Sequence, residues 1–232
     1  MEPRQGHTKQ MGKNIHLIIF DLDGTLLNTL EDLADSVNFI LSENDFPDHP
    51  LEDYKTFVGR GIDDLLRRSL PKDFENPEKF MQIRRNFVEH YEAHKFNKTK
   101  PYDGILDLLD ELIQSNIQLA VASNKYHAAT VELVGRYFAK IPFVAAFGHR
   151  KDKLKKPAPQ IVEDILQIAK TGKENTLYVG DSSVDMKTAK SAGVKSIGVT
   201  WGFRSEEELK ENGADFIIHH PKELMEVLGQ LQ

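Results

Sequence analysis

The chain contains no cysteine and no excess of basic residues. Because none of its 232 residues is Cys, disulfides, thiolate nucleophiles and thiolate metal ligands are all excluded. Its 30 Lys and Arg stand against 36 Asp and Glu, which gives a formal net charge of −6. Proteins that bind nucleic acids usually present a basic face, so we expect no nucleic-acid partner.

Long apolar runs are also missing. No stretch approaches the roughly 18 apolar residues of a membrane-spanning helix, so we expect no membrane partner. Residues 1–13 are polar and lack the apolar segment of a secretory signal. We predict that they form a flexible N-terminal tail and that the protein is cytoplasmic. The 9 His residues form no cluster with metal-ligand spacing.

The rest of the chain alternates between short apolar runs and helical patterns. A first strand is predicted over Asn14–Phe20. Later strands, each preceded by a predicted helix, are expected at residues 117–122, 143–147, 176–179, 194–199 and 216–218. This alternation predicts an α/β fold, a Rossmann-like parallel sheet with helices on both faces. We assign residues 14–28 and 99–232 to this α/β core.

Residues 29–98 carry only helical patterns. Thr29 is expected to cap the first helix, with Asp32 three residues later completing a capping box. Asn76 and Pro77 are typical of the N-cap and first position of a later helix. We therefore predict an α-helical cap of residues 29–98, inserted after the first strand.

Two carboxylates follow the first predicted strand. Ligands of an open parallel sheet bind at the carboxyl ends of the strands, so residues just after each apolar run are candidates for a site. Asp21 and Asp23 are two apart on extended backbone and face the same way, while Leu22 turns into the core. One acid can then attack while the other transfers protons. Alone, the Asp-Gly pattern fits an ordinary turn as well.

A hydroxyl and a lysine appear at later positions of the same kind. Ser123 and Asn124 directly follow a predicted strand, where a hydroxyl and backbone N–H groups can hold phosphoryl oxygens. Lys156 comes directly before the helix predicted over Pro157–Lys170, and its ammonium can neutralise a phosphoryl group and an attacking carboxylate. Taken singly, a Ser-Asn turn and a solvated basic loop are the more ordinary interpretations.

A second acid pair follows the strand predicted over residues 176–179. Asp181, after Gly180, supplies the oxygen ligand that a hard Mg²⁺ ion prefers. Asp185 is expected on the first turn of the next helix, where it can complete the ligand shell or orient its waters. We therefore predict Mg²⁺ as the cofactor.

Taken in order, these motifs resemble those of haloacid-dehalogenase-superfamily phosphatases. The four family motifs appear as DLDGT at 21–25, SN at 123–124, the lysine of KKPAP at 156 and GDSSVD at 180–185. The resemblance covers the chain from about residue 14 to the last helix. Five further stretches, FVGRGI, PYDGI, SNK, KPAP and TWGF, are most similar to phosphoglycolate phosphatases.

The resemblance implies a role for each motif. Asp21 would become an aspartyl-phosphate, and Asp23 would protonate the leaving oxygen and then activate water. Mg²⁺ would be held by Asp21, the backbone carbonyl of Asp23 and Asp181. Ser123 and Lys156 would hold the phosphoryl group of a small phosphorylated metabolite. Ser123 departs from the Thr that close relatives often carry, but it keeps the hydroxyl.

Gly59, Arg60 and Gly61 interrupt the helical pattern of the predicted cap. Glycines let the backbone approach a ligand closely and provide hinge freedom. Arg60 can pair with a second anionic group of the substrate, such as the carboxylate of phosphoglycolate. A plain turn with a solvated Arg60 is the alternative, and both interpretations stay open.

Several alternative functions stay open. A phosphosugar mutase uses the same carboxylate pair, and a pyrophosphatase of the same superfamily would share the motifs. A receiver-type phosphoacceptor signalling module also combines Mg²⁺, Asp, a hydroxyl and Lys, but it lacks a helical insertion. An inactive scaffold is disfavoured by the intact site residues Asp21, Asp23, Lys156 and Asp181. The sequence indicates neither the physiological substrate nor the oligomeric state.

Overall fold

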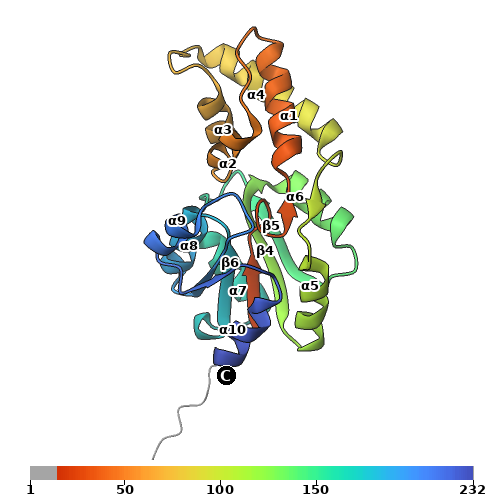
Figure 1. Cartoon of the computed structure of the whole chain (residues 1–232), viewed down its shortest axis with the longest axis vertical. Helices are drawn as coiled ribbons and strands as arrows, with labels where there is room; N and C mark the ends of the chain where they lie inside the picture. The colour runs from red at the N-terminus through yellow and green to blue at the C-terminus, as the bar shows by residue number, and fades with distance from the viewer. Residues whose placement is uncertain (1–14, 232) are drawn as a thin grey trace, which may run out of the picture.

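The computed structural model describes residues 15–231. Its centre is a sheet of six strands in the order β5-β4-β1-β6-β7-β8, and all neighbouring strands are parallel (Figure 1). In chain order the strands are β1 Leu17–Phe20, β4 Gln118–Tyr126, β5 Phe143–His149, β6 Thr176–Gly180, β7 Lys195–Val199 and β8 Phe216–Ile218. The predicted tail, residues 1–13, lies outside the described residues.

Helices cover both faces of the sheet because its central strand is apolar on both sides. Ile18 and Phe20 of β1 belong to one hydrophobic cluster, while Leu17 and Ile19 belong to the other. The first cluster includes residues of α5 Ile105–Gln114, α6 His127–Tyr137 and α10 Glu223–Leu231. The second includes residues of α7 Gln160–Ala169 and α8 Ser183–Ala192. The predicted α/β fold class is confirmed.

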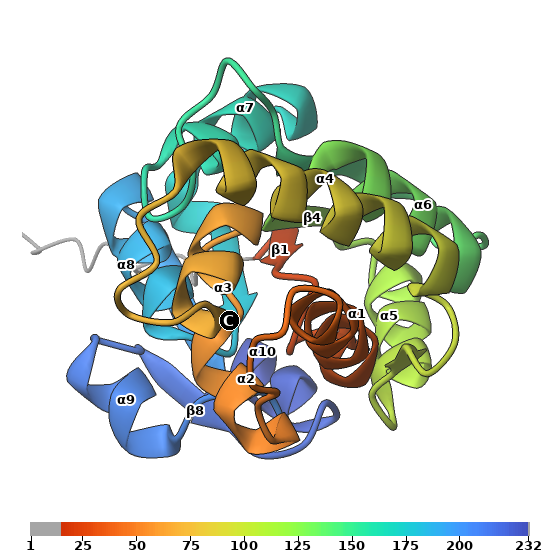
Figure 2. The ribbon, with the colours of Figure 1, turned by 90° about the horizontal axis from the view of Figure 1, so that it is seen from above.

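The residues between β1 and β4 include a bundle of four helices. These are α1 Leu30–Ser42, α2 Leu51–Phe57, α3 Ile62–Ser69 and α4 Pro77–His94. They share a hydrophobic cluster of their own and lie over one end of the sheet, where Figure 2 shows β1 between them. Asn76 caps α4 by accepting from the Lys79 N–H at 3.0 Å, as its sequence predicts. We refer to this bundle as the cap.

A short two-stranded ribbon joins the cap to the core. β2, Leu27–Asn28, pairs antiparallel with β3, Lys100–Pro101. The segment that leads from the core into the cap and the segment that leads back therefore lie side by side. Asp32 is buried beside this ribbon and accepts hydrogen bonds from the Lys98 and Thr99 N–H groups, both at 2.9 Å. The capping box predicted for Thr29 and Asp32 is therefore wrong, because both side chains bind residues outside their own helix turn.

Two further elements differ from the sequence prediction. β4 continues past Ala122 to Tyr126, with an irregular register against β5, because the polar residues that follow Ala122 are buried and bonded. α7 begins at Gln160 instead of Pro157, after a turn in which the Ala158 N–H donates to the Lys155 carbonyl. Both changes lie beside the loops that carry the candidate site.

No helix among residues 15–231 is long and apolar enough to cross a membrane. β1, β4 and β6 are neighbours in the sheet, and at their carboxyl ends lie Asp21 directly after β1, Ser123 in the last part of β4 and Asp181 directly after β6. The division into residues 14–28 plus 99–232 and residues 29–98 stays a prediction about domain boundaries.

Candidate active site

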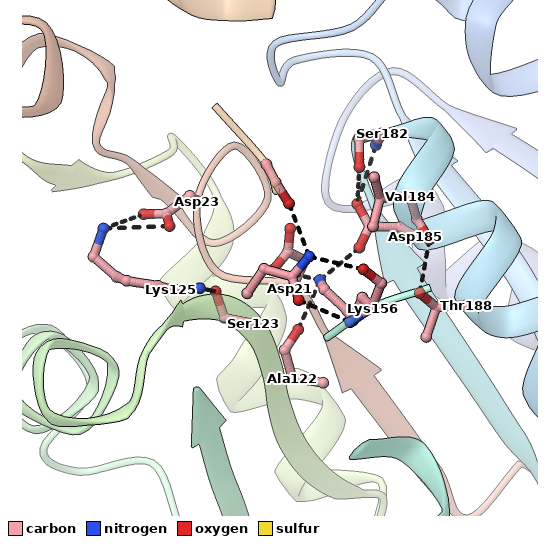
Figure 3. Close-up of polar contacts among 12 residues, drawn as sticks. Asp21, Asp23, Ala122, Ser123, Lys125, Lys156, Ser182, Val184, Asp185 and Thr188 are labelled. Carbon is pink, nitrogen blue, oxygen red and sulfur yellow. Dashed lines mark hydrogen bonds and ion pairs between the residues drawn. The ribbon is translucent and has the colours of Figure 1, made fainter. Parts of the chain in front are cut away.

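Asp21 is the first residue after β1 and lies at the centre of the site (Figure 3). Its backbone N–H donates to the Val179 carbonyl of β6 at 2.9 Å, which continues the sheet ladder and fixes where the side chain begins. The carboxylate is buried, and its Oδ1 lies 2.9 Å from the Lys156 ammonium. Burial raises the pKa of Asp21 and nearby Asp185 raises it further, against the opposing effect of Lys156.

Lys156 reaches this point from the loop before α7 and is 4% exposed. Its Nζ donates to the Ala122 carbonyl at 2.9 Å, the Tyr178 hydroxyl at 3.0 Å and Asp185 Oδ1 at 2.7 Å. Burial alone would lower its pKa, but the carboxylates of Asp185 and Asp21 outweigh this effect and raise the pKa above its ordinary value. The side chain is therefore a fixed positive charge beside Asp21.

Asp23 points to a different neighbour from Asp21, as Figure 3 shows. Its Oδ1 accepts from the Thr29 hydroxyl at 2.7 Å and lies 3.1 Å from Lys125 Nζ, which is 3.3 Å from Oδ2. Lys125 Nζ also lies 4.7 Å from the centre of the Tyr91 ring of the cap. These contacts hold the Asp23 carboxylate in one orientation.

Lys125 is a site residue that the sequence interpretation missed. The available signal was its position directly after Ser123 and Asn124, but an irregular strand end does not show which way its side chain points. The ammonium is buried and pairs with Asp23, which is 102 residues away in the chain. The sequence also predicts a capping role for Thr29 and not its hydrogen bond to Asp23.

Ser123 and Asn124 both line the space beside Asp21, but they differ in what they bind. Ser123 Oγ accepts the Lys125 N–H at 3.1 Å and keeps its own proton available for another acceptor. Asn124 accepts from the Lys156 N–H at 2.8 Å and donates to the Lys156 and Gly59 carbonyls at 3.1 and 3.0 Å. Its side chain thus ties the lysine loop to the cap.

Asp181 follows β6 and is held against two glycines. Its Oδ2 accepts the Phe203 N–H at 2.7 Å. A Cβ atom on Gly24 would lie 2.3 Å from this oxygen, and one on Gly202 would lie 2.3 Å from Asp181 Cβ, so only glycine fits at either position. Burial and then Asp185 raise the pKa of Asp181 to about 7, despite the Phe203 hydrogen bond.

Asp185 both caps a helix and extends the charged cluster. It forms a capping box with Ser182, whose N–H and hydroxyl donate to Asp185 Oδ2 at 3.2 and 2.6 Å. Its other oxygen binds Lys156, as described above. The predicted role of Asp185 at the metal is compatible with this capping geometry.

The acidic cluster fits a hard divalent cation. Asp21, Asp181 and Asp185 each offer a carboxylate oxygen, and these three atoms lie within 4.8 Å of one another. All three residues are buried, with one ammonium, that of Lys156, bonded among them. Three carboxylates beside one lysine leave excess negative charge in a region of low dielectric, which a cation would offset. Oxygen-only donors suit Mg²⁺.

A cavity lies between this edge of the core and the cap. It has a volume of about 40 Å³ open to the centres of water molecules, and Asp21 and Asp23 line its floor. Gly59 and Gly61 also line it. Arg60, between them, is exposed and is not among the lining residues. The structure thus brings together the predicted acids, Ser123 and the two glycines, while the specificity role of Arg60 stays a prediction.

Comparison with known proteins agrees with this geometry. Residues 18–199 match the family model described as haloacid dehalogenase-like hydrolase. The chain is 34% identical over 194 residues to a phosphoglycolate phosphatase of Agrobacterium fabrum, covering 81% of each chain. It is 30% identical to one of Aliivibrio fischeri, covering 94% of this chain and 99% of that one.

A solved structure shares the whole architecture. The crystal structure of a predicted phosphoglycolate phosphatase from Haemophilus somnus superposes with a TM-score of 0.86 at 26% sequence identity. The match covers 92% of this chain and 97% of that chain, so it includes both cap and core.

Proposed function

The chain belongs to the haloacid dehalogenase-like hydrolase family, and from this premise we propose that it is a Mg²⁺-dependent phosphatase of small phosphate monoesters. Relatives named phosphoglycolate phosphatase support its assignment to the phosphoric monoester hydrolases. One observation carries the mechanism. Asp21 and Asp23 line the same cavity from one loop, and each has its own lysine, Lys156 at 2.9 Å and Lys125 at 3.1 Å.

In the first step, an oxygen of Asp21 attacks phosphorus and the bond between phosphorus and the leaving oxygen breaks. Asp23 in its acid form transfers a proton to that oxygen, so the product leaves as an alcohol. The result is an aspartyl-phosphate on Asp21 and a carboxylate on Asp23. In this scheme Lys156 and the Ser123 hydroxyl contact the phosphoryl oxygens.

In the second step, Asp23 takes a proton from water, and the water oxygen attacks the same phosphorus. The bond between phosphorus and Asp21 breaks, which releases inorganic phosphate and restores both acids to their starting forms. Using one residue as acid and then base requires that it stay beside the reacting atoms. Lys125 and Thr29 are positioning residues in this scheme, because they bind Asp23 and restrict its rotation.

Asp21 and Asp181 would hold Mg²⁺ with their carboxylates, together with the Asp23 backbone carbonyl, and Asp185 would complete the shell or orient its waters. When bound, Mg²⁺ supplies positive charge that offsets these acids and the phosphoryl oxygens. Gly24 and Gly202 leave room for the Asp181 side chain in this position.

Trapping the intermediate tests the proposal. The protein would be mixed with Mg²⁺ and phosphoglycolate, quenched in acid within a single turnover, digested and examined by mass spectrometry. A phosphoryl group should appear on the peptide that contains Asp21. When p-nitrophenyl phosphate, whose leaving group needs no proton, replaces phosphoglycolate, Asp23→Asn should increase the amount of this peptide by slowing the second step. A phosphoryl group on Ser123 or on a histidine, or phosphate release without any labelled peptide, would contradict the mechanism.

Phosphoglycolate is the first monoester to assay because the relatives carry its name. A mutase or a pyrophosphatase of the same superfamily stays an alternative, and the products distinguish them. A hexose phosphate incubated with a mutase yields an isomeric sugar phosphate, whereas a phosphatase yields free phosphate. The cytosolic location predicted from the sequence stays a prediction.

A further inference from the structure

The cap contributes an almost entirely apolar wall to the cavity. Core residues on the opposite side are charged or polar, as described above. The residues that line the cavity from the cap are Leu33, Val58, Gly59, Gly61, Ile62, Leu65, Phe87 and Tyr91. Tyr91 is the one side chain among them that carries a polar atom. On the cap side, recognition of the leaving group therefore depends on apolar contact and on this one hydroxyl.

The Tyr91 hydroxyl is a donor without a partner. The side chain is 0% exposed, and its oxygen has no hydrogen-bond partner among residues 15–231. A hydroxyl buried in this way is destabilising unless something binds it, and few are found in native proteins. The phenol stays protonated at neutral pH, because burial raises its pKa well above the ordinary value. A ligand in the cavity would supply the missing acceptor.

The Tyr91 ring is held on both sides. It stacks on Phe87 with ring centres 5.8 Å apart and planes 7° apart, and Lys125 Nζ lies 4.7 Å from its centre. Since Lys125 also binds Asp23, the phenol is held close to the acid proposed to protonate the leaving oxygen. An oxygen on the leaving group, a few bonds from the phosphate ester, would lie within this part of the cavity.

The charged side chains that line the cavity are already paired. Asp23 binds Lys125, and Asp21 binds Lys156 behind it. Arg60 is exposed and outside the lining. A leaving group with a second anionic charge would lose its hydration here without gaining an unpaired cation, which is costly. A neutral hydroxyl or carbonyl oxygen avoids this cost and can accept from the phenol.

We infer that Tyr91 is a substrate-binding residue that donates a hydrogen bond to an uncharged oxygen of the leaving group. The preferred substrates are then small phosphate monoesters whose leaving group is apolar apart from one neutral oxygen and carries no second anion. This inference rests on the proposed phosphatase function. It concerns only which monoester is selected, not how the phosphate ester is cleaved.

Three monoesters of similar size distinguish the effects of a neutral oxygen, an apolar group and a second negative charge on the leaving group. They are 2-hydroxyethyl phosphate, n-propyl phosphate and phosphoglycolate, whose leaving groups end in a hydroxyl, a methyl and a carboxylate. With Mg²⁺ present, kcat/KM of the wild type should be highest for 2-hydroxyethyl phosphate and lowest for phosphoglycolate. Because this ranking is measured on the wild-type protein, it does not depend on whether a variant folds.

Tyr91→Phe removes the hydroxyl alone and should lower kcat/KM for 2-hydroxyethyl phosphate about fivefold to tenfold, the effect of one hydrogen bond. The value for n-propyl phosphate should not change. Tyr54→Phe is the matched control, because Tyr54 is also 0% exposed in the cap but donates its hydroxyl to Asn38 instead of lining the cavity. Thermal unfolding of both variants measures any loss of stability.

The inference is overturned if phosphoglycolate has the highest kcat/KM, or if Tyr91→Phe changes all three monoesters by the same factor. In both cases phosphate release itself would leave the proposed function standing. If none of the three releases phosphate, the proposed function fails and the inference fails with it.

Discussion

The two sides of the cavity are built from opposite kinds of side chain. On the core side, Asp21, Asp23 and two lysines form ion pairs at 2.9–3.1 Å. On the cap side, the wall is apolar with one unpartnered hydroxyl. Both sides are well packed, so the contrast is one of chemistry.

This contrast indicates a division of labour. Charges that stabilise a reacting phosphoryl group act best when they are fixed in advance, and a network of buried ion pairs fixes them. Selection among small leaving groups depends on shape and on few polar contacts, which an apolar wall provides. Changes on the core side should therefore reduce turnover for all substrates, whereas changes on the cap side should alter the preference among them.

The largest effect is expected for Asp21→Asn. An amide cannot form the aspartyl-phosphate, so phosphate release should fall by at least about a thousandfold for every monoester. Asp110→Asn, on an exposed face of the core helix α5, is the control and should leave kcat unchanged. Residual activity of even a tenth of wild type would show that the core side does not supply the nucleophile.

Removal of the metal should have the next largest effect. The candidate ligands Asp21, Asp181 and Asp185 all belong to the core, so EDTA should lower activity by at least about a hundredfold, and Mg²⁺ should restore it. Mg²⁺ should also raise the thermal unfolding temperature of the wild type, because binding stabilises the native state, and Asp181→Asn should abolish this increase. Full activity after exhaustive dialysis against EDTA would contradict the assignment.

Asp23→Asn, a change on the core side, should slow the reaction by different factors for leaving groups that need a proton and for those that do not. Loss of the acid should slow bond breaking about a hundredfold for an alkyl phosphate, whose alkoxide needs a proton. p-Nitrophenolate leaves without one, so the burst of p-nitrophenol in a single turnover should be much less affected. Equal slowing of this first step for both esters would remove Asp23 from the acid role.

The smallest effect is expected for Arg60→Ala. Since Arg60 is exposed and does not line the cavity, KM for phosphoglycolate and for p-nitrophenyl phosphate should each change less than about twofold. Of the two interpretations that the sequence leaves open, the one in which Arg60 pairs with a substrate carboxylate makes the opposite prediction: KM rises for phosphoglycolate alone. That result would mean that Arg60 moves into the cavity when substrate binds, and the cap side would then carry a charge after all.

The succession of strands along the chain, and the acids that follow them, could be predicted from the sequence. Asp21, Ser123 and Asp181 each follow a short apolar run, and the structure brings them to one edge of the sheet. These features depend on local periodicity, which a sequence records directly.

The contacts that give the site its orientation were not predictable in this way. Thr29 and Asp32 form a plausible capping box by spacing, yet Thr29 binds Asp23, and Asp32 binds Thr99, which is 67 residues away. Lys125 pairs with an acid that is 102 residues away. A pattern shows which face of an element is apolar but not which distant side chain lies opposite it.

The sequence by itself determined the α/β core, the helical insertion, and the acids and the one lysine, Lys156, that we propose for phosphoryl transfer, because each depends on residue type and short spacing. Only the tertiary structure decided how these residues are paired, that Lys125 belongs with Asp23, and that Tyr91 and not Arg60 lines the cavity. The reason is that the cavity forms between the cap, which has a hydrophobic cluster of its own, and the polar edge of the core. Which side chains face each other there depends on how the cap is docked on the core, which no local pattern encodes.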